Sequence, residues 1–345
     1  MTGYASTGSI ADVARALSTA QRIAIVSHAR PDGDAAGSVL ALARALRILG
    51  KHVDAILTGD VPPEILGLAE DGEVRRDTSG PMPTNIDLAV VVDTGAWNQL
   101  EPLDAWIRAM APRVVGLDHH ARGDDVAALR VVDPRAASTT QIVVQVVDAL
   151  GVDISRAVPW GGRSIAEAAF AGLATDTGWF QFQNAGADAF ALASRLIAAG
   201  VDRIGLYQAL EETGRPQRLA VLARALQSLI YYADGRVAIM SVSHRDFAET
   251  TATSDDLGGV VNIPLEVAKV GVSVLMTESK PGTTKVSFRS KARAGGAPWL
   301  NVSEFAAQFG GGGHIFAAGA KFAVDSATAR ATIAEAFERV KEKLL

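Results

Sequence analysis

The sequence predicts an α/β protein of two domains, the first built on a largely parallel sheet and the second smaller. Its 345 residues are long for a single compact core. Short β-rich apolar runs alternate with helical patterns through the first half, as they do in βα units. A second alternation begins after a stretch that is helical only. These observations favour two α/β domains with a cleft between them.

The first domain is expected to contain five strands with helices between them. One helix is predicted over 36–49, where apolar residues recur at helical spacing before Gly50. Further helices are predicted over 138–150, which Gly151 closes, and over 165–174. The strands are predicted at 23–26, 52–57, 88–92, 114–117 and, at an edge of the sheet, 129–132.

The remainder of the chain is expected to hold a connector and the second domain. Three helical patterns without a strand lie between about residues 187 and 230. Strands are then predicted at 237–242, 270–276 and 285–288, followed by a Gly-rich loop and a helix over 327–345. The predicted division is a metal-binding domain at 1–195, a helical linker at 196–221 and a substrate-binding domain at 222–345.

Composition excludes several classes of protein. There is no cysteine, so disulfides, thiolate nucleophiles and Cys-based zinc sites are excluded, and metal chemistry must use His, Asp and Glu. No apolar run approaches the roughly 20 residues that span a bilayer, and the first residues are small and polar. We therefore expect a cytoplasmic protein that does not enter the membrane. The net charge of −5 disfavours a long nucleic-acid footprint.

Four clusters of acidic residues or histidine lie where apolar runs end, which is where open α/β sheets bind ligands. The first, at 27–34, has the sequence Ser-His-Ala-Arg-Pro-Asp-Gly-Asp, and the second is Asp93-Thr94-Gly95. The third is Asp118-His119-His120, and the fourth is Asp176-Thr177-Gly178. Taken singly, the first, second and fourth could be ordinary turns or caps. Two adjacent histidines after an aspartate seldom arise by composition in a chain with 6 histidines.

Together the clusters offer enough ligands for two divalent ions that share one carboxylate. Four carboxylates, two imidazoles and no thiolate favour Mn²⁺, with Mg²⁺, Co²⁺ or Fe²⁺ as substitutes. Two such ions would lower the pKa of a shared water and neutralise phosphoryl oxygens, so that water could attack phosphorus at neutral pH. The predicted metal ligands are His28, Asp32, Asp34, Asp93, His119 and Asp176.

These motifs resemble those of the DHH phosphoesterases, a family named for the tripeptide at 118–120. The segment Lys-Val-Ser-Phe-Arg-Ser at 285–290, followed by four glycines and His314, resembles the DHH-associated C-terminal domain. The layout is most similar to the bacterial group that acts on short oligoribonucleotides (nanoRNA) and on adenosine 3′,5′-bisphosphate (pAp). The resemblance covers nearly the whole chain.

The resemblance also implies roles for single residues. It implies that His28 and Asp32 hold one metal, that Asp34, His119 and Asp176 hold the other, and that Asp93 lies between them. It implies that His120 faces the substrate phosphate and that Asp118 orients the histidines. Asp93, Asp118 and His120 are thus the predicted catalytic residues. The predicted substrate-binding residues are Arg289, Ser290, Gly311, Gly312, Gly313 and His314, because glycines admit phosphate to backbone N–H groups and Arg donates two hydrogen bonds.

The sequence and the resemblance together predict a Mn²⁺-dependent phosphodiesterase or phosphatase that cleaves substrates of one to five nucleotides. Its expected substrates are short RNA or DNA oligonucleotides, such as the dinucleotide pApA, or pAp. Three alternatives stay open: a cyclic dinucleotide phosphodiesterase, a family II-type inorganic pyrophosphatase, and a nucleotide sensor without catalysis. The oligomeric state, a homodimer included, is also left open.

Overall fold

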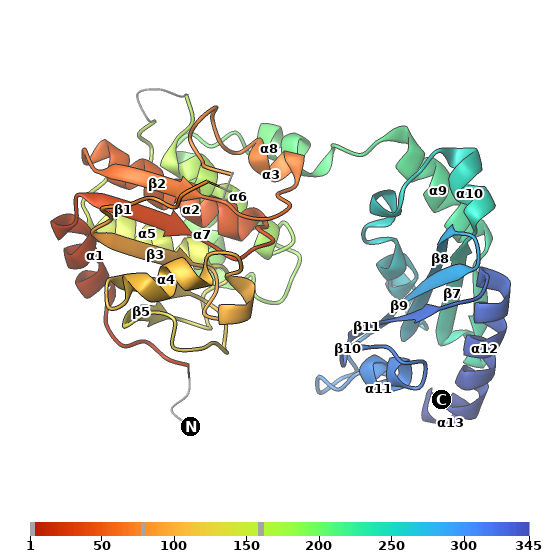
Figure 1. The fold of residues 1–345 in the computed structure, drawn as a ribbon. Helices are drawn as coiled ribbons and strands as arrows, with labels where there is room; N and C mark the ends of the chain where they lie inside the picture. The colour runs from red at the N-terminus through yellow and green to blue at the C-terminus, as the bar shows by residue number, and fades with distance from the viewer. Residues whose placement is uncertain (1–3, 77–79, 158–161, 345) are drawn as a thin grey trace. The chain divides into compact units, whose positions relative to one another are not determined.

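The structure is a computed structural model that describes residues 4–76, 80–157 and 162–344. The chain forms two compact units, Met1–Thr213 and Gly214–Leu345 (Figure 1). The residues predicted as a separate linker, 196–221, are therefore divided between the two units. No described helix is both long enough and apolar enough to cross a lipid bilayer.

The first unit contains a five-stranded parallel sheet in the order β2-β1-β3-β4-β5. β1, β3 and β4 are nearly continuous apolar runs because helices cover both faces of the sheet. β5 lies at an edge, as the sequence predicted. The strands are β1 (Arg22–Val26), β2 (His52–Ile56), β3 (Leu88–Val92), β4 (Val114–Asp118) and β5 (Leu129–Val132).

The helices of the first unit enclose two apolar layers. Alternate residues of β1 point to opposite layers: Ile23 and Ile25 join the larger core, and Ala24 and Val26 join the smaller one on the α4 side. The helices are α1 (Ile10–Thr19), α2 (Gly33–Ile48), α3 (Pro63–Leu66), α4 (Asp104–Met110), α5 (Thr139–Ala149), α6 (Ile165–Asp176), α7 (Ala187–Ala198), α8 (Arg203–Glu211) and the 3₁₀ helix η1 (Trp97–Gln99).

Helix α2 is buried through its first fourteen residues and crosses α6 closely. Glycine allows this approach, because a Cβ at Gly37 would lie 2.6 Å from the carbonyl oxygen of Ala168. Within the helix, the fully buried Arg44 makes two 2.8 Å hydrogen bonds to Glu73. The bidentate pairing offsets the cost of burying both charges, and the contact ties α2 to the loop before β3.

The second unit contains a six-stranded mixed sheet in the order β10-β11-β9-β8-β7-β6. Only β7 and β8 pair in parallel. One face of β9 packs on a core that Phe305 of α11 and Ile333 of α12 help to build. The strands are β6 (Ile230–Tyr232), β7 (Val237–Val242), β8 (Val272–Lys280), β9 (Thr283–Ser290), β10 (Gly312–His314) and β11 (Ala317–Phe322).

Helices and turns connect these strands. α9 and α10 pack near β7 and β8 and form a second apolar cluster with η3 and η4. The elements are α9 (Pro216–Gln227), η2 (Ala233–Gly235), α10 (His244–Thr250), η3 (Ser254–Leu257), η4 (Val260–Glu266), α11 (Val302–Ala307), α12 (Ser326–Arg339) and α13 (Lys341–Leu344).

The α/β class predicted for both halves is confirmed, with three local corrections. The Gly-rich segment expected to be a loop contains a strand, β10, which pairs with β11. Asp34, expected in a loop, lies in the first turn of α2, for which Asp32 is the N-cap. Asp176, expected just past a helix, is the last residue of α6.

Candidate metal centre

The candidate metal ligands lie where β1, β3 and β4 end and where α2 and α6 approach those ends. In a parallel sheet these carboxyl ends share one edge, so residues distant in sequence become neighbours. Ring nitrogens and carboxylate oxygens form three groups within which the ligand atoms lie no more than 4.8 Å apart. The groups are His28, Asp32 and Asp93; Asp34, His119 and Asp176; and Asp93, His119 and His120.

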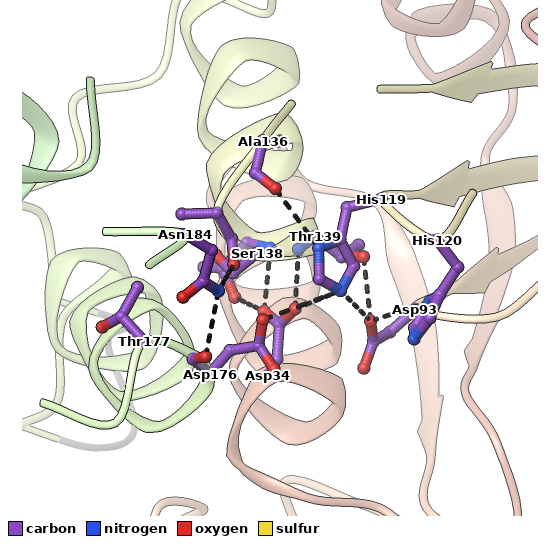
Figure 2. Close-up of polar contacts among 12 residues, drawn as sticks. Asp34, Asp93, His119, His120, Ala136, Ser138, Thr139, Asp176, Thr177 and Asn184 are labelled. Carbon is purple, nitrogen blue, oxygen red and sulfur yellow. Dashed lines mark hydrogen bonds and ion pairs between the residues drawn. The ribbon is translucent and has the colours of Figure 1, made fainter. Parts of the chain in front are cut away.

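His119 belongs to two of these groups (Figure 2). Its Nε2 is 3.7 Å from an oxygen of Asp93, 3.7 Å from one of Asp176 and 4.0 Å from one of Asp34. Its Nδ1 lies 3.3 Å from the carbonyl oxygen of Ala136. A carbonyl only accepts, so Nδ1 carries the proton and the lone pair of Nε2 is free for a cation.

Asp93 lies between His28 and His119, which share no group. Its Oδ2 is 3.4 Å from Nε2 of His28, and its Oδ1 is 3.7 Å from Nε2 of His119. The side chain is directed by an uncommon backbone conformation, because Asp93 follows β3 with a φ of 62°. The hydroxyl of Thr139 donates a 2.9 Å hydrogen bond to Oδ1. The two oxygens of one carboxylate therefore face different imidazoles.

Asp34 is held at the start of α5. The backbone N–H groups of Thr139 and Thr140 donate to its two oxygens over 2.6 Å and 2.9 Å, and the Thr140 hydroxyl also donates to it. A helix N-terminus favours negative charge, so these contacts offset part of the cost of burying the carboxylate. Figure 2 shows Asp34, Asp176 and His119 directed toward one another.

Asp118 contacts only one of the two histidines that follow it. Its Oδ1 accepts from the backbone N–H of His120 over 3.1 Å and from Nδ1 of His120 over 2.7 Å. The expected contact with His119 is absent among its described hydrogen bonds, because that ring turns toward Ala136. The hydrogen bond from His120 to Asp118 raises the pKa of His120 to about 9 despite partial burial. The imidazole is therefore positively charged at neutral pH, with a proton on each nitrogen.

The charges of the cluster fit cations. Burial, followed by mutual repulsion, raises the pKa of Asp34 and of Asp93 well above the usual range. Burial also raises the pKa of Asp176 and lowers that of His28. Each shift disfavours the charged form of its group, and divalent cations would reverse the unfavourable term for the carboxylates. The oxygen and nitrogen donors and the mutual repulsion of the carboxylates therefore both suit the binding of hard divalent cations.

Two hollows adjoin the loop that carries His28. One, of about 770 Å³, is lined by Asp32, Thr175 and Glu211 among others, and the second, of about 610 Å³, reaches His28 and Asn98. Arg30 lines both hollows. There is therefore concave space beside the cluster, with a cation at its margin.

In the second unit, strand pairing brings Arg289 and His314 onto one face. Arg289 pairs with Ala317, and Ala317 pairs with His314. Directly opposed residues share a face, so the two side chains project from the same side, two strand spacings or about 10 Å apart. Gly313 lies beside them with a φ of 147°, and a Cβ there would lie 2.7 Å from the Cα of Ala318.

Ser290 does not join this face. It follows Arg289 in the strand and therefore points to the opposite side, where it is buried and its hydroxyl accepts from the backbone N–H of Leu300 over 3.1 Å. Of these two residues, Arg289 therefore shares a face with His314 and Ser290 does not.

Several site residues were not predicted from the sequence. Thr139 and Thr140 donate hydrogen bonds to candidate ligands, and the run Ser-Thr-Thr at 138–140, which is typical of a helix start, was the available signal. Asn184 donates to the backbone oxygens of Asp176 and Ala137, with no local pattern to indicate it. Tyr4 donates a 2.8 Å hydrogen bond to Asp118 across 114 positions of sequence.

The fold and the clustered ligands define a class: an α/β protein with a candidate two-cation centre at the carboxyl edge of a parallel sheet. The chain belongs to the DHH family. The model of the DHH family, N-terminal domain, matches residues 22–173, and that of the DHHA1 domain matches residues 234–344. The resemblance stated from the motifs is therefore confirmed, and with it the assignment to the DHH phosphoesterases.

Curated relatives match most of the chain. It is 32% identical over 298 residues to the bifunctional oligoribonuclease and PAP phosphatase NrnA of Thermus thermophilus, covering 86% of this chain and 83% of the relative. It is 25% identical over 312 residues to the protein of the same name from Bacillus subtilis, covering 90% and 92%.

Solved structures show the same fold. An exopolyphosphatase-related protein from Bacteroides fragilis superposes with a TM-score of 0.81 at 24% identity, covering 97% of both chains. The exonuclease RecJ solved with bound manganese gives a TM-score of 0.52 at 16% identity, covering 97% of this chain and 94% of the other. At these identities the likeness concerns the fold alone.

Proposed function

We propose that this protein hydrolyses phosphate esters of very short nucleotides, oligonucleotides such as pApA and the bisphosphate pAp, with the help of two divalent cations. One observation carries the proposal: the two oxygens of Asp93 face imidazoles from two different ligand groups, at 3.4 Å and 3.7 Å. The names of the curated relatives, oligoribonuclease and PAP phosphatase, supply the substrate class.

The ligands divide around Asp93. His28 and Asp32 would hold one cation, Asp34, His119 and Asp176 would hold the other, and Asp93 would contact both. When bound, the cations supply an activated water and neutralise charge on the phosphoryl oxygens. Manganese fits best, because the set mixes four carboxylates with two imidazoles and contains no thiolate.

The remaining residues bind and orient the substrate. His120 is positively charged because Asp118 accepts a hydrogen bond from its Nδ1 and raises its pKa. Its Nε2 therefore also carries a proton, which it can donate to a phosphoryl oxygen. In the second unit Arg289, His314 and the glycines at 311–313 would bind a further phosphate of the nucleotide, Arg289 through a bidentate contact. Ser290 is left out of this set because it lies on the buried face of β9.

Short substrates follow from charge. The chain carries a net charge of −5, and five basic residues without an acid lie between residues 279 and 303. A long polymer would gain from many phosphate contacts, whereas a few cations suffice for one to five nucleotides.

Phosphate or nucleotide release from pAp, pApA, a cyclic diadenylate and pyrophosphate tests the proposal in one experiment. The protein is stripped of metal with a chelator and assayed with Mn²⁺, Mg²⁺ or Zn²⁺ added back. We expect turnover of pApA and pAp, none in chelator, and the best recovery with Mn²⁺. Turnover of pyrophosphate alone would indicate a pyrophosphatase, that of the cyclic substrate alone a cyclic dinucleotide phosphodiesterase, and tight binding without turnover a sensor.

A further inference from the structure

Tyr4 lies far from the candidate metal ligands in sequence but reaches their immediate surroundings. Residues 5–8 run beside the edge strand β5. The hydroxyl of Ser6 donates to the carbonyl oxygen of Val132 over 3.0 Å and accepts from its N–H over 2.9 Å. The backbone N–H of Thr7 donates to the carbonyl oxygen of Arg130 over 2.9 Å. This strap fixes the start of the chain and delivers Tyr4 to Asp118.

The tyrosine ring is enclosed by glycines. A Cβ on Gly95 would overlap the Tyr4 hydroxyl, and a Cβ on Gly123 would lie 2.7 Å from Cζ of the ring. The guanidinium of Arg130 lies 5.6 Å from the ring centroid. Neither glycine has a positive φ, so the backbone conformation does not require glycine at these positions. The absence of a side chain instead leaves room for the tyrosine ring. Gly95 belongs to the Asp93-Thr94-Gly95 motif, which joins this pocket to the metal centre.

The two oxygens of Asp118 have different partners. Oδ1 accepts from the backbone N–H and from Nδ1 of His120, and Oδ2 accepts from the Tyr4 hydroxyl over 2.8 Å. The Asp118 residue is 0% exposed. The terminal torsion of an aspartate is broad, so a carboxylate held at one oxygen only could rotate. The Tyr4 hydroxyl holds the second oxygen and thereby fixes the plane of the Asp118 carboxylate.

We propose that Tyr4 is a positioning residue for the hydrolysis: it fixes Asp118, which in turn fixes the orientation of the His120 ring. This inference rests on the proposed function for its activity readout. A buried oxygen that loses its partner is left unsatisfied, and the carboxylate then turns toward another donor. His120 would lose its fixed orientation while the metal ligands keep theirs.

Tyr4→Phe tests the role, because phenylalanine keeps the ring in its pocket and removes the hydroxyl. Loss of a partner behind a functional imidazole lowers activity about 10-fold to 100-fold. We expect a fall of this size in kcat for pApA, with KM within about twofold and the manganese content unchanged. Gly123→Ala should produce a similar loss although it retains the tyrosine, because the added Cβ displaces the ring.

Ser6→Ala is the matched control. It removes a hydroxyl from the same strap without touching Asp118, and the backbone hydrogen bonds of Thr7 and Gly8 to Arg130 still hold the strap, so kcat should stay near the wild-type value. If Ser6→Ala and Tyr4→Phe lower kcat equally, the strap matters and the Tyr4 hydroxyl does not. A wild-type kcat for Tyr4→Phe would also overturn the proposal.

A double-mutant cycle separates positioning from general stability. In a His120→Asn background, Tyr4→Phe should cause no further loss of kcat, because the residue through which it acts is gone. Equal losses in both backgrounds would refute the connection. Crystal structures of wild type and Tyr4→Phe give a readout without activity: the Asp118 carboxylate should rotate and its hydrogen bond to Nδ1 of His120 should lengthen beyond about 3.2 Å.

The outcomes also separate this proposal from the proposed function. If the wild-type protein turns over none of the nucleotides, the proposed function fails, and the crystal structures alone decide the role of Tyr4. If the wild type is active and the contact between Asp118 and His120 is unaltered in Tyr4→Phe, the proposed function stands and the positioning role fails.

Discussion

Asp93 shows how much one residue contributes to this site. It is 2% exposed, follows β3 in a conformation that few non-glycine residues adopt, and presents one oxygen to His28 and the other to His119. Burying a carboxylate in this backbone conformation lowers the stability of the fold. The cost makes sense if the carboxylate holds two cations together, because a bridging anion offsets their mutual repulsion.

Asp93→Asn should therefore lower both metal content and turnover. The amide keeps the shape of the side chain but removes the charge between the cations, so at least one cation should be lost. We expect kcat for pApA to fall about three orders of magnitude or more, at about 1.4 kcal/mol per decade. Elemental analysis beside kcat measures both effects.

Asp54→Asn provides a matched control, because it makes the same change at an exposed position on β2. It should leave metal content and kcat near wild type. Two bound metals with near-normal turnover in Asp93→Asn would refute the bridging role. An unchanged melting temperature would show that the loss does not arise from unfolding.

The carboxylates of the cluster also predict how the metal-free protein responds to pH. The folded-state pKa values of Asp34 and Asp93 lie well above the ordinary value of 3.8. The stability that these two groups contribute is therefore fully present below pH 3.8, and it is lost as the pH rises through their folded-state pKa values. His120 acts in the same direction between pH 6.5 and about 9. The Tm in chelator should fall as pH rises from weakly acidic to weakly basic.

Divalent cations should reverse this loss. At a Mn²⁺ concentration about 100-fold above its Kd, binding adds about 2.7 kcal/mol, which raises Tm by about 5 to 11 °C for a unit of this size. Thermal melts with chelator or Mn²⁺ across this pH range provide the measurement. The double variant Asp34→Asn/Asp93→Asn should flatten the pH dependence, and a wild-type slope in that variant would contradict the assignment.

At the scale of elements, the crossing of α2 and α6 supports the metal centre. Gly172 of α6 faces the N-terminus of α5: a Cβ there would overlap the Thr140 hydroxyl and lie 3.1 Å from Oδ1 of Asp34. The helices must approach this closely for Asp34 to reach the N–H groups of α5. A core contact between helices thus sets the position of a metal ligand.

Gly172→Ala should weaken metal binding as well as stability. The added methyl group cannot fit without moving Thr140, and such overpacking costs about 1 to 3 kcal/mol. Since Thr140 donates to Asp34, the shift should also lower Mn²⁺ affinity, which titration calorimetry measures.

Gly186→Ala is a suitable comparison, because a Cβ at that helix N-cap meets no atom within 4 Å. It should leave Mn²⁺ affinity unchanged. If Gly172→Ala lowers Tm but binds Mn²⁺ as tightly as wild type, the crossing supports the fold and not the centre.

At the scale of the whole molecule, the proposed activity assigns different tasks to the two units. The first supplies the cation ligands and the second supplies Arg289 and His314. Arg289→Ala should raise KM for pAp about 10-fold to 100-fold and lower kcat less, because a charge-assisted contact of about 1.5 to 3 kcal/mol is lost from the bound substrate.

Steady-state kinetics with pAp measures both constants. Arg339→Ala on α12 is the control, because α12 packs against the other face of the sheet, and it should leave KM unchanged. An unchanged KM in Arg289→Ala would remove this residue from the substrate site.

The sequence by itself determined the order and type of the main elements and the identities of the candidate ligands. Apolar runs mark β1, β3, β4 and β7 within a residue at each end, because burial between helices requires continuous apolar side chains. The ligands follow those runs, and a parallel sheet brings its carboxyl ends to one edge. Local pattern was therefore sufficient to predict that His28, Asp93 and His119 would meet.

Only the tertiary structure decided how these residues are supported. The contact of Asp34 with Thr139 spans 105 positions, and that of Tyr4 with Asp118 spans 114. The side of β9 to which Ser290 points depends on which face the core covers, and the strand character of 312–314 depends on pairing with β11. Periodicity reports only which residues share a face of one element, whereas these contacts are fixed by how separate elements pack together.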